Sequence, residues 1–394
     1  GGEAVPGPGG VGQRHPWASV FIGALLLIGM ALPVFGLRLG FSDEGNFPEN
    51  TTTRKAYDLL AEGFRPGFNG PFLMVAELPD GFDAEALAPI QAAVQDDPGV
   101  VFVTPATPND EKDPAAATAV QWVIIPTSSP QAEETTDTVN RLRAETLPAA
   151  ERAAGVDVAL TGSVPVQVDF SEYLASRLPY FFGAVLALSF LLLMAVFRSL
   201  LVPLKAVVMN LLSMGAAYGL VVALFQWGWF NGITGIQTGP IEPFVPMMLF
   251  AIVFGLSMDY EVFLLSRVRE EWQHTGDSHT SVADGLAATA KVITAAAAIM
   301  VFVFGSFVLE SDRIIKLFGV GLASSIFLDA TVVRMLLVPA TMELLGDKNW
   351  WLPGWLDRLL PNIDVEGNVD DELPVDEPPS PEAPPQDRTP ELIG

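Results

Sequence analysis

The chain has 394 residues, of which 50% are apolar and 17% are charged, and its formal net charge is −25. Soluble proteins usually carry about 25% charged residues, so this composition favours a membrane protein. The chain has no cysteine, which excludes disulfides and thiolate metal sites. Its histidines, His15, His274 and His279, lie outside the apolar segments, and it has no GxxxxGK[ST] motif. We therefore expect no bound metal or cofactor, no ATP hydrolysis and no nucleic-acid partner.

The two ends of the chain have the composition of unfolded segments. Residues 1–16 begin GGEAVPGPGG, without an initiator methionine, and read as a linker inside a longer protein. Residues 346–394 are predicted to form an acidic, disordered cytoplasmic tail. Its part from 362 onward has ten acids, seven prolines and one base, so we expect it to be disordered.

Six apolar segments are long enough to cross about 30 Å of hydrocarbon, which takes roughly 20 residues. They are Trp17–Leu37, Pro179–Phe197, Pro203–Trp227, Phe244–Leu265, Val292–Leu309 and Ile314–Met342. The first is too long for the apolar part of a signal peptide and lacks a small-residue cleavage site, so an uncleaved span is favoured. Span one therefore covers residues 17–37, and spans two to six lie within residues 179–345.

The basic residues between the spans predict the orientation, because cytoplasmic loops are enriched in Lys and Arg. The richer side holds Arg14, Arg198, Lys205, Arg267, Arg269, Lys291, Lys348 and Arg358. The short loops of the other side hold Arg313 and Lys316. We therefore predict a multi-pass plasma-membrane protein with both termini in the cytoplasm and residues 38–178 outside it.

The block 38–178 reads as a soluble α+β domain. Helical patterning at 52–64 precedes a β-α-β-β-α-β succession at 72–78, 84–95, 100–103, 119–125, 133–145 and 156–162. This order favours a ferredoxin-like split βαβ unit. The block has no histidine and no serine elbow, so an enzymatic role is not expected.

Two further features concern the spans themselves. Gly215 and Gly219 form a GxxxG spacing, which allows two helix backbones to approach closely. The polar stretch 270–292 joins spans four and five, and we expect part of it to lie as a helix along the membrane face.

The stretch GLSMDYEVFLLSRVREEW (255–272) carries acids inside an apolar run. An ionised carboxylate in hydrocarbon is costly, and such residues usually face the bundle interior on an ion or proton path. Asp259 is therefore a candidate proton carrier, and Tyr260 supplies a hydroxyl that can donate to a carboxylate. Glu261 lies about 200° around the helix from Asp259, and we expect it near the interface, paired with a base. The alternative for Asp259 is a purely structural hydrogen bond or ion pair.

A second candidate lies in FLDATVVRMLLVP, where Asp329 is near the centre of span six and Arg334 follows five residues later. In an α-helix five residues amount to about 140° net, so the two are not expected to share a face. We expect each to meet a partner on another helix. Proximity of Asp329 to Asp259 would then form a buried acidic cluster.

Three segments resemble the MMPL family of actinobacterial membrane transporters, in the resistance–nodulation–division superfamily. They are FRSLLVPLKAVVMNLLSMGAAYGL (197–220), FGLSMDYEVFLLSRVREEW (254–272) and DATVVRMLLVPATMELLGDKNWWLP (329–353). The resemblance implies two six-span halves, each with an extracytoplasmic porter domain, of which this chain is similar to the second. It also implies a proton relay formed by Asp259 and Tyr260 with Asp329 and Arg334. The loop 229–243 does not match a segment of the family.

The implied function is proton-driven export of lipids or hydrophobic metabolites to the cell envelope. The implied partners are a missing N-terminal six-span half, the lipid substrate and the membrane, with a homo-oligomer as a further arrangement. Two different functions stay open beside it: a drug or sterol-type exporter of another branch of the superfamily, and a non-transporting lipid-binding scaffold.

Overall fold

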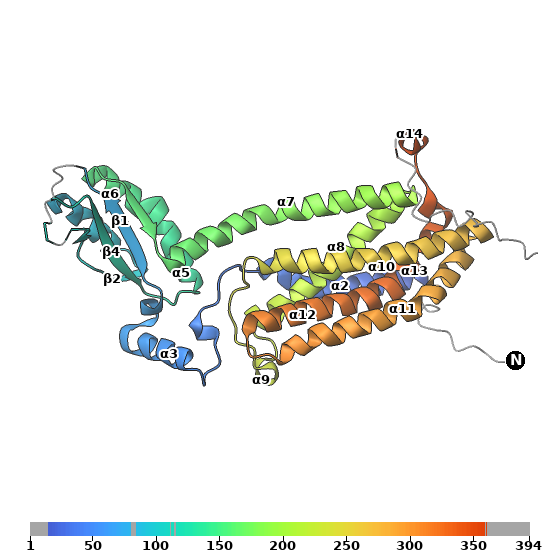
Figure 1. The fold of residues 1–394 in the computed structure, drawn as a ribbon, viewed down its shortest axis with the longest axis horizontal. Coiled ribbons are helices and arrows are strands. Elements are labelled where there is room, and N and C mark those ends of the chain that lie inside the picture. Colours follow the sequence, from blue (N-terminus) through green and yellow to red (C-terminus); the bar gives the residue numbers. More distant parts are fainter. Residues whose placement is uncertain (1–14, 80–83, 111, 114–115, 359, 361–394) are drawn as a thin grey trace, which may run out of the picture.

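The computed structural model describes residues 15–79, 84–110, 112–113, 116–358 and 360. The chain forms a helical bundle and a smaller α+β unit, which we call the extramembrane domain. The long helix α7 and the segment that follows the first span connect the two (Figure 1). We call the bundle end beside this domain the near end and the opposite one the far end. Most of the linker predicted over 1–16, and the tail from 361, lie outside the described residues.

The bundle contains six helices that are long and apolar enough to cross a membrane, which confirms a polytopic helical membrane protein with six spans. The elements are α2 (Pro16–Ala31) with η1 (Leu32–Gly36), α7 (Ser163–Phe197), α8 (Leu201–Val221) with η7 (Val222–Gln226), α10 (Val245–Thr275), α11 (Ser278–Ser306) with η8 (Phe307–Leu309), and α12 (Arg313–Leu328) with η9 (Asp329–Leu337) and α13 (Val338–Leu345). The short helix α9 (Asn231–Thr234) lies in the loop before α10.

Several helices extend beyond the apolar segments that predicted them. Helix α7 begins at Ser163, inside the extramembrane domain, and continues through Pro179 without a break. Helices α10 and α11 are joined by a tight turn at Gly276, whose φ is +66°. The stretch expected along the membrane face instead lengthens these two helices. Apolar content marks where a helix meets hydrocarbon, and the hydrogen bonding continues through the polar residues.

The predicted GxxxG contact is present between α8 and α2. A Cβ added at Gly219 would lie 1.9 Å from the carbonyl oxygen of Met30, and one at Gly215 would lie 3.3 Å from Ala31 Cβ. Only a residue without a side chain allows this approach at Gly219, so the glycine pair fixes α8 against α2.

The extramembrane domain holds a five-stranded sheet with helices. Before the sheet come η2 (Glu44–Asn46), α3 (Thr52–Phe64) and η3 (Pro66–Asn69). The sheet and its helices are β1 (Phe72–Glu77), η4 (Ala84–Leu87), α4 (Ala88–Gln95), β2 (Val100–Val103), β3 (Thr107–Pro108), β4 (Ala119–Pro126), α5 (Glu133–Arg141), η6 (Leu142–Thr146), α6 (Leu147–Ala154) and β5 (Val158–Thr161). The strand order is β2-β4-β1-β5, with β3 paired to β4, and every pair is antiparallel.

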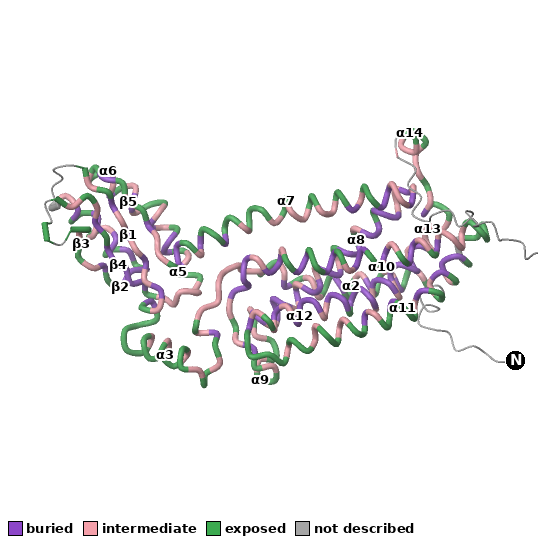
Figure 2. The backbone as a smooth tube through the Cα atoms, viewed as in Figure 1, coloured by how far each residue is buried: buried purple, intermediate pink, exposed green. Residues whose placement is uncertain are grey.

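Alternating side chains on the central strands build the core of this domain. Phe72 and Met74 on β1 and Trp122 and Ile124 on β4 are fully buried, and the residues between them are less buried or exposed. Period-two alternation of this kind is typical of a sheet with one covered face. In Figure 2 the buried residues are concentrated in the sheet and in the bundle, while the middle of α7 is largely exposed or intermediate.

The far end of the bundle is closed by residues that the sequence assigned to the disordered tail. Residues 346–350 form η10 (Gly346–Trp350), and α14 (Gly354–Asp357) follows. Arg198 Nη2 lies 2.6 Å from Asp357 Oδ1, and Trp272 stacks on Trp350 at 5.5 Å. The described part of the tail is therefore folded against the turn between α7 and α8.

Candidate functional site

The candidate site is a buried ion pair in the last span. Arg334 Nε donates to Asp329 Oδ2 at 2.8 Å, and the two side chains are 1% and 7% exposed. Both residues belong to η9, which follows α12 without interruption. Burial of a charged pair inside a span is costly, so its partners are the first feature to account for.

The expectation that Asp329 and Arg334 would not share a face is wrong, because η9 is a π-helical segment. In a π-helix the backbone hydrogen bonds join residue i to residue i+5, so side chains five apart come close to one above the other. The sequence estimate assumed α-helical geometry throughout the span. π-helical segments are frequently found at functional sites.

Arg334 also ties η9 to α10. Its Nη2 donates to the backbone carbonyl and, at 3.2 Å, to the hydroxyl of Ser257, and its guanidinium lies 5.3 Å from the ring centre of Tyr260. Ser257 in turn donates to Asn210 Oδ1 of α8 at 2.7 Å. One guanidinium thus joins a carboxylate, a carbonyl, a hydroxyl and an aromatic face, and the contacts span three helices.

Asp259 lies outside this cluster. Its side chain is exposed, whereas Asp329 is buried against Arg334, so the expected Asp259–Asp329 acidic cluster is not formed within this chain. The Tyr260 hydroxyl donates to Met300 Sδ of α11 at 3.6 Å instead of to a carboxylate. Asp259 therefore presents a carboxylate on the surface of the bundle.

The sequence placed Asp259 and Glu261 on different sides of α10, and that prediction is confirmed. Glu261 is 3% exposed and points into the bundle, and its place near the membrane interface stays a prediction. Its charge interacts with Arg334 and with Lys205 of α8. Glu261 is thus part of the same buried charge group as the ion pair.

Lys205 is the residue that sequence reasoning missed. It was counted as a loop charge, yet it is 8% exposed and its Nζ has no hydrogen-bond partner among the described residues. The signal was available, because Lys205 lies one turn before Met209 and two turns before Ser213, both on the buried face of α8. Among the described residues, no group of three or more His, Asp or Glu side chains is arranged to hold a metal ion.

The fold and the site together define a polytopic helical membrane protein with charged side chains buried between its spans and an α+β domain at one end. Comparison with known proteins refines this class. The model of the MMPL family matches residues 82–360. The chain belongs to the MMPL family.

Three relatives indicate the range of functions among similar proteins. Membrane protein YdfJ of Bacillus subtilis is 40% identical over 87% of this chain and 46% of its own length. The mycolic acid-containing lipids exporter MmpL11 of Mycolicibacterium smegmatis is 36% identical over 91% of this chain and 37% of its own length. The heme uptake protein MmpL11 of Mycobacterium tuberculosis (strain H37Rv) is 35% identical over 90% of this chain and 36% of its own length. The chain thus spans less than half of each.

Proposed function

We propose that this chain is one half of a transporter that uses the proton gradient to export lipids or hydrophobic metabolites, and not an enzyme. The observation that carries the proposal is the buried Asp329–Arg334 pair, which contacts α10 through Ser257 and Tyr260. Ionisable groups inside a membrane usually mark ion or proton paths.

The geometry offers a physical route from protonation to movement. When Asp329 takes up a proton, it no longer balances the charge of Arg334. The guanidinium then relies on the Ser257 oxygens and on Glu261, so the contacts between η9 and α10 change. Each proton that crosses the membrane supplies about 2.3 kcal/mol per 100 mV, which is the free energy that such a rearrangement would use.

Asp259 supports the idea of a second half. Its carboxylate is exposed on α10, and exposure to lipid would be costly. We propose that an N-terminal six-span half, or a second copy of this chain, covers this face and completes the relay of Asp259 and Tyr260 with Asp329 and Arg334. The relatives, each more than twice as long as the region matched, are consistent with a two-half protein.

We further propose that the extramembrane domain is a ferredoxin-like porter domain outside the cytoplasm, with both termini inside. The sheet order supports this, since β4 lies between β1 and β2, and β1 lies between β4 and β5, as in two split βαβ units. The bias of basic residues supports the orientation.

The substrate class comes from the relatives. One is an exporter of mycolic acid-containing lipids, which favours lipid export, and one is a heme uptake protein, which makes heme the second candidate. A drug or sterol-type exporter and a lipid-binding scaffold that transports nothing are the competing functional hypotheses.

The test is reconstitution into proteoliposomes of this chain alone and of this chain joined to a six-span partner half. Proton entry is followed with internal pyranine, and lipid movement with NBD-labelled phosphatidylethanolamine and external dithionite. We expect gradient-dependent movement of the lipid with the joined halves, and its loss in Asp259→Asn and Asp329→Asn. Lipid movement that ignores the proton gradient would refute the proton-driven part, and heme movement without lipid movement would refute the substrate class.

A further inference from the structure

Three segments far apart in sequence meet at the near end of the bundle. They are the linker 38–46 after η1, the turn 128–132 before α5, and the loop 235–242 before α10. A Cβ added at Gly239 of that loop would lie 2.9 Å from Gln131 Oε1 and 3.0 Å from Asn46 Nδ2. The glycine therefore lets the bundle loop touch both the linker and the extramembrane domain.

On the bundle side, Arg313 at the start of α12 organises the loop. Its Nη1 lies 2.8 Å from Glu242 Oε1, and both side chains are almost fully buried. Its other nitrogens donate to the backbone carbonyls of Phe225 (3.4 Å), Gln237 (3.1 Å), Gly239 (3.0 Å) and Pro240 (2.8 Å). Ser42 of the linker donates to the same Glu242 oxygen. The first residue of the last span thus fixes the loop, and the loop holds the linker.

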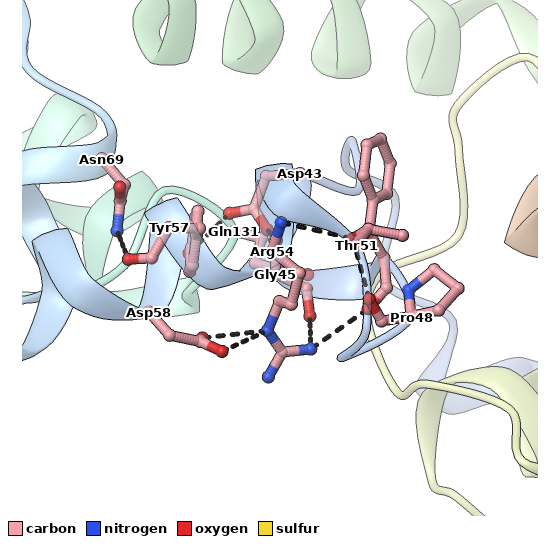
Figure 3. A network of polar contacts seen from close by, with 10 residues as sticks. Asp43, Gly45, Pro48, Thr51, Arg54, Tyr57, Asp58, Asn69 and Gln131 are labelled. Atoms are coloured by element: carbon pink, nitrogen blue, oxygen red, sulfur yellow. Dashed lines mark hydrogen bonds and ion pairs between the residues drawn. The ribbon is translucent and has the colours of Figure 1, made fainter.

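On the other side, Asp43 of the linker holds the extramembrane domain. Its carboxylate accepts hydrogen bonds from Gly45 N (2.8 Å), the Tyr57 hydroxyl of α3 (2.9 Å) and Gln131 Nε2 (2.6 Å). Figure 3 shows Asp43, Tyr57 and Gln131 close together in this network. Arg38 Nη2 adds a bond of 2.8 Å to the Gln131 carbonyl. Gln131 is therefore held by the linker through its side chain and its backbone.

We propose that Asp43 and Gln131 form a latch that positions the extramembrane domain relative to the last span. The route is contiguous: α12, which continues into η9, begins at Arg313, Arg313 fixes the loop, the loop holds the linker, and the linker holds Gln131. The other covalent connection of the domain to the bundle is α7, whose middle is largely uncovered, so the latch is a second attachment between the two units. This inference does not depend on transport.

The charge at Asp43 makes the latch testable with one conservative change. Burial raises the pKa of Asp43, and the neighbouring Glu44 adds to this, while the hydrogen bonds from Tyr57, Gly45 and Gln131 lower it. Two cations face this group: Arg54, which donates to the Gly45 carbonyl, and Arg38, which donates to the Gln131 carbonyl. Gln131→Glu replaces a donor with a second carboxylate, and like charges at hydrogen-bond distance repel.

The experiment measures the distance between the two units in the full chain. Cysteines at Ala92 of α4 and Ser306 of α11 carry spin labels; both positions are exposed, and the chain has no other cysteine. Double electron–electron resonance in nanodiscs gives the distance distribution. The variants are Gln131→Glu, the pair Asp43→Asn with Gln131→Glu, and the control Gln121→Glu, the same change at an exposed position on β4.

We expect one narrow peak for the parent and for Gln121→Glu, and loss of that peak for Gln131→Glu at neutral pH. The peak should return in the double variant, where an amide again faces a carboxylate. It should also return for Gln131→Glu on acidification, because two adjacent carboxylates share a proton at low pH. An unchanged narrow peak in Gln131→Glu would overturn the latch. A peak that stays broad in the double variant would overturn the assignment of Asp43 as the partner.

Discussion

The buried ion pair of the last span predicts an unequal response to the loss of either partner. Removing one member of a buried pair costs about 3–5 kcal/mol, because the remaining charge is left uncompensated. Asp329→Asn leaves Arg334 with the Ser257 oxygens and with the charge of Glu261. Arg334→Met instead leaves both Asp329 and Glu261 without their shared cation.

We therefore expect the free energy of unfolding of the bundle to fall by about 3 kcal/mol in Asp329→Asn and by about 5 kcal/mol in Arg334→Met. The double variant should lose less than Arg334→Met alone, since replacing both members of a buried pair is often close to neutral. Unfolding by SDS in mixed micelles is followed by helical circular dichroism, to which the bundle contributes most. The control is Asp259→Asn, whose exposed side chain should change stability by no more than about 0.5 kcal/mol.

The reverse order of the two single variants would refute this account of the charges. So would losses below about 1 kcal/mol in both, because that is the size expected of an exposed pair. A double variant that loses the sum of the two single changes would show that Asp329 and Arg334 act independently.

Three further results are expected. Glu261→Gln should lower the unfolding free energy by about 2 kcal/mol, because it unbalances buried cations, and a change below about 0.5 kcal/mol in the same SDS titration would contradict this. Burial raises the pKa of Asp97, but the hydrogen bonds and charge of Arg141 bring it below its ordinary 3.8. The stabilisation that the ionised Asp97 gives the folded domain is complete above that pH and is lost as the pH falls below it. Arg141→Met should therefore lower the free energy of unfolding of the extramembrane domain at neutral pH and leave a smaller further loss on acidification. Urea unfolding at each pH measures both. Finally, an impermeant maleimide applied to intact cells should label a cysteine at Asn109 and not one at Gln273, and the opposite pattern would reverse the orientation.

The sequence was sufficient for the elements whose signal is local. Six spans follow from the length of the apolar segments, and the short apolar run FLMVAEL at 72–78 predicts the strand that the structure has as β1. The Gly215–Gly219 spacing likewise located a helix contact, because only the absence of a side chain permits that approach.

The sequence failed where the answer depends on backbone geometry or on another helix. No residue pattern in FLDATVVRMLLVP predicts a π-helical segment, yet that segment determines whether the side chains of Asp329 and Arg334 form an ion pair. The fold of residues 346–358 depends on partners such as Arg198 and Trp272, more than 70 residues away, so local composition was misleading there. The exposure of Asp259 has the same cause, since α10 alone does not determine which of its faces the other helices cover.

The structure also changes which basic residues count toward the predicted orientation. Charge bias applies to basic residues that stay in water near the membrane surface. Arg313 was the main exception to the pattern, and it is buried against Glu242 and the carbonyls of its loop, so it is not a loop charge. Lys205 counted in favour and is buried too. Without these two, Lys316 alone remains among the bases of the short outer loops, against seven that the sequence assigns to the cytoplasmic side: Arg14, Arg198, Arg267, Arg269, Lys291, Lys348 and Arg358. The ratio therefore rises from eight against two to seven against one, and the prediction of cytoplasmic termini rests on a cleaner pattern than the sequence first offered.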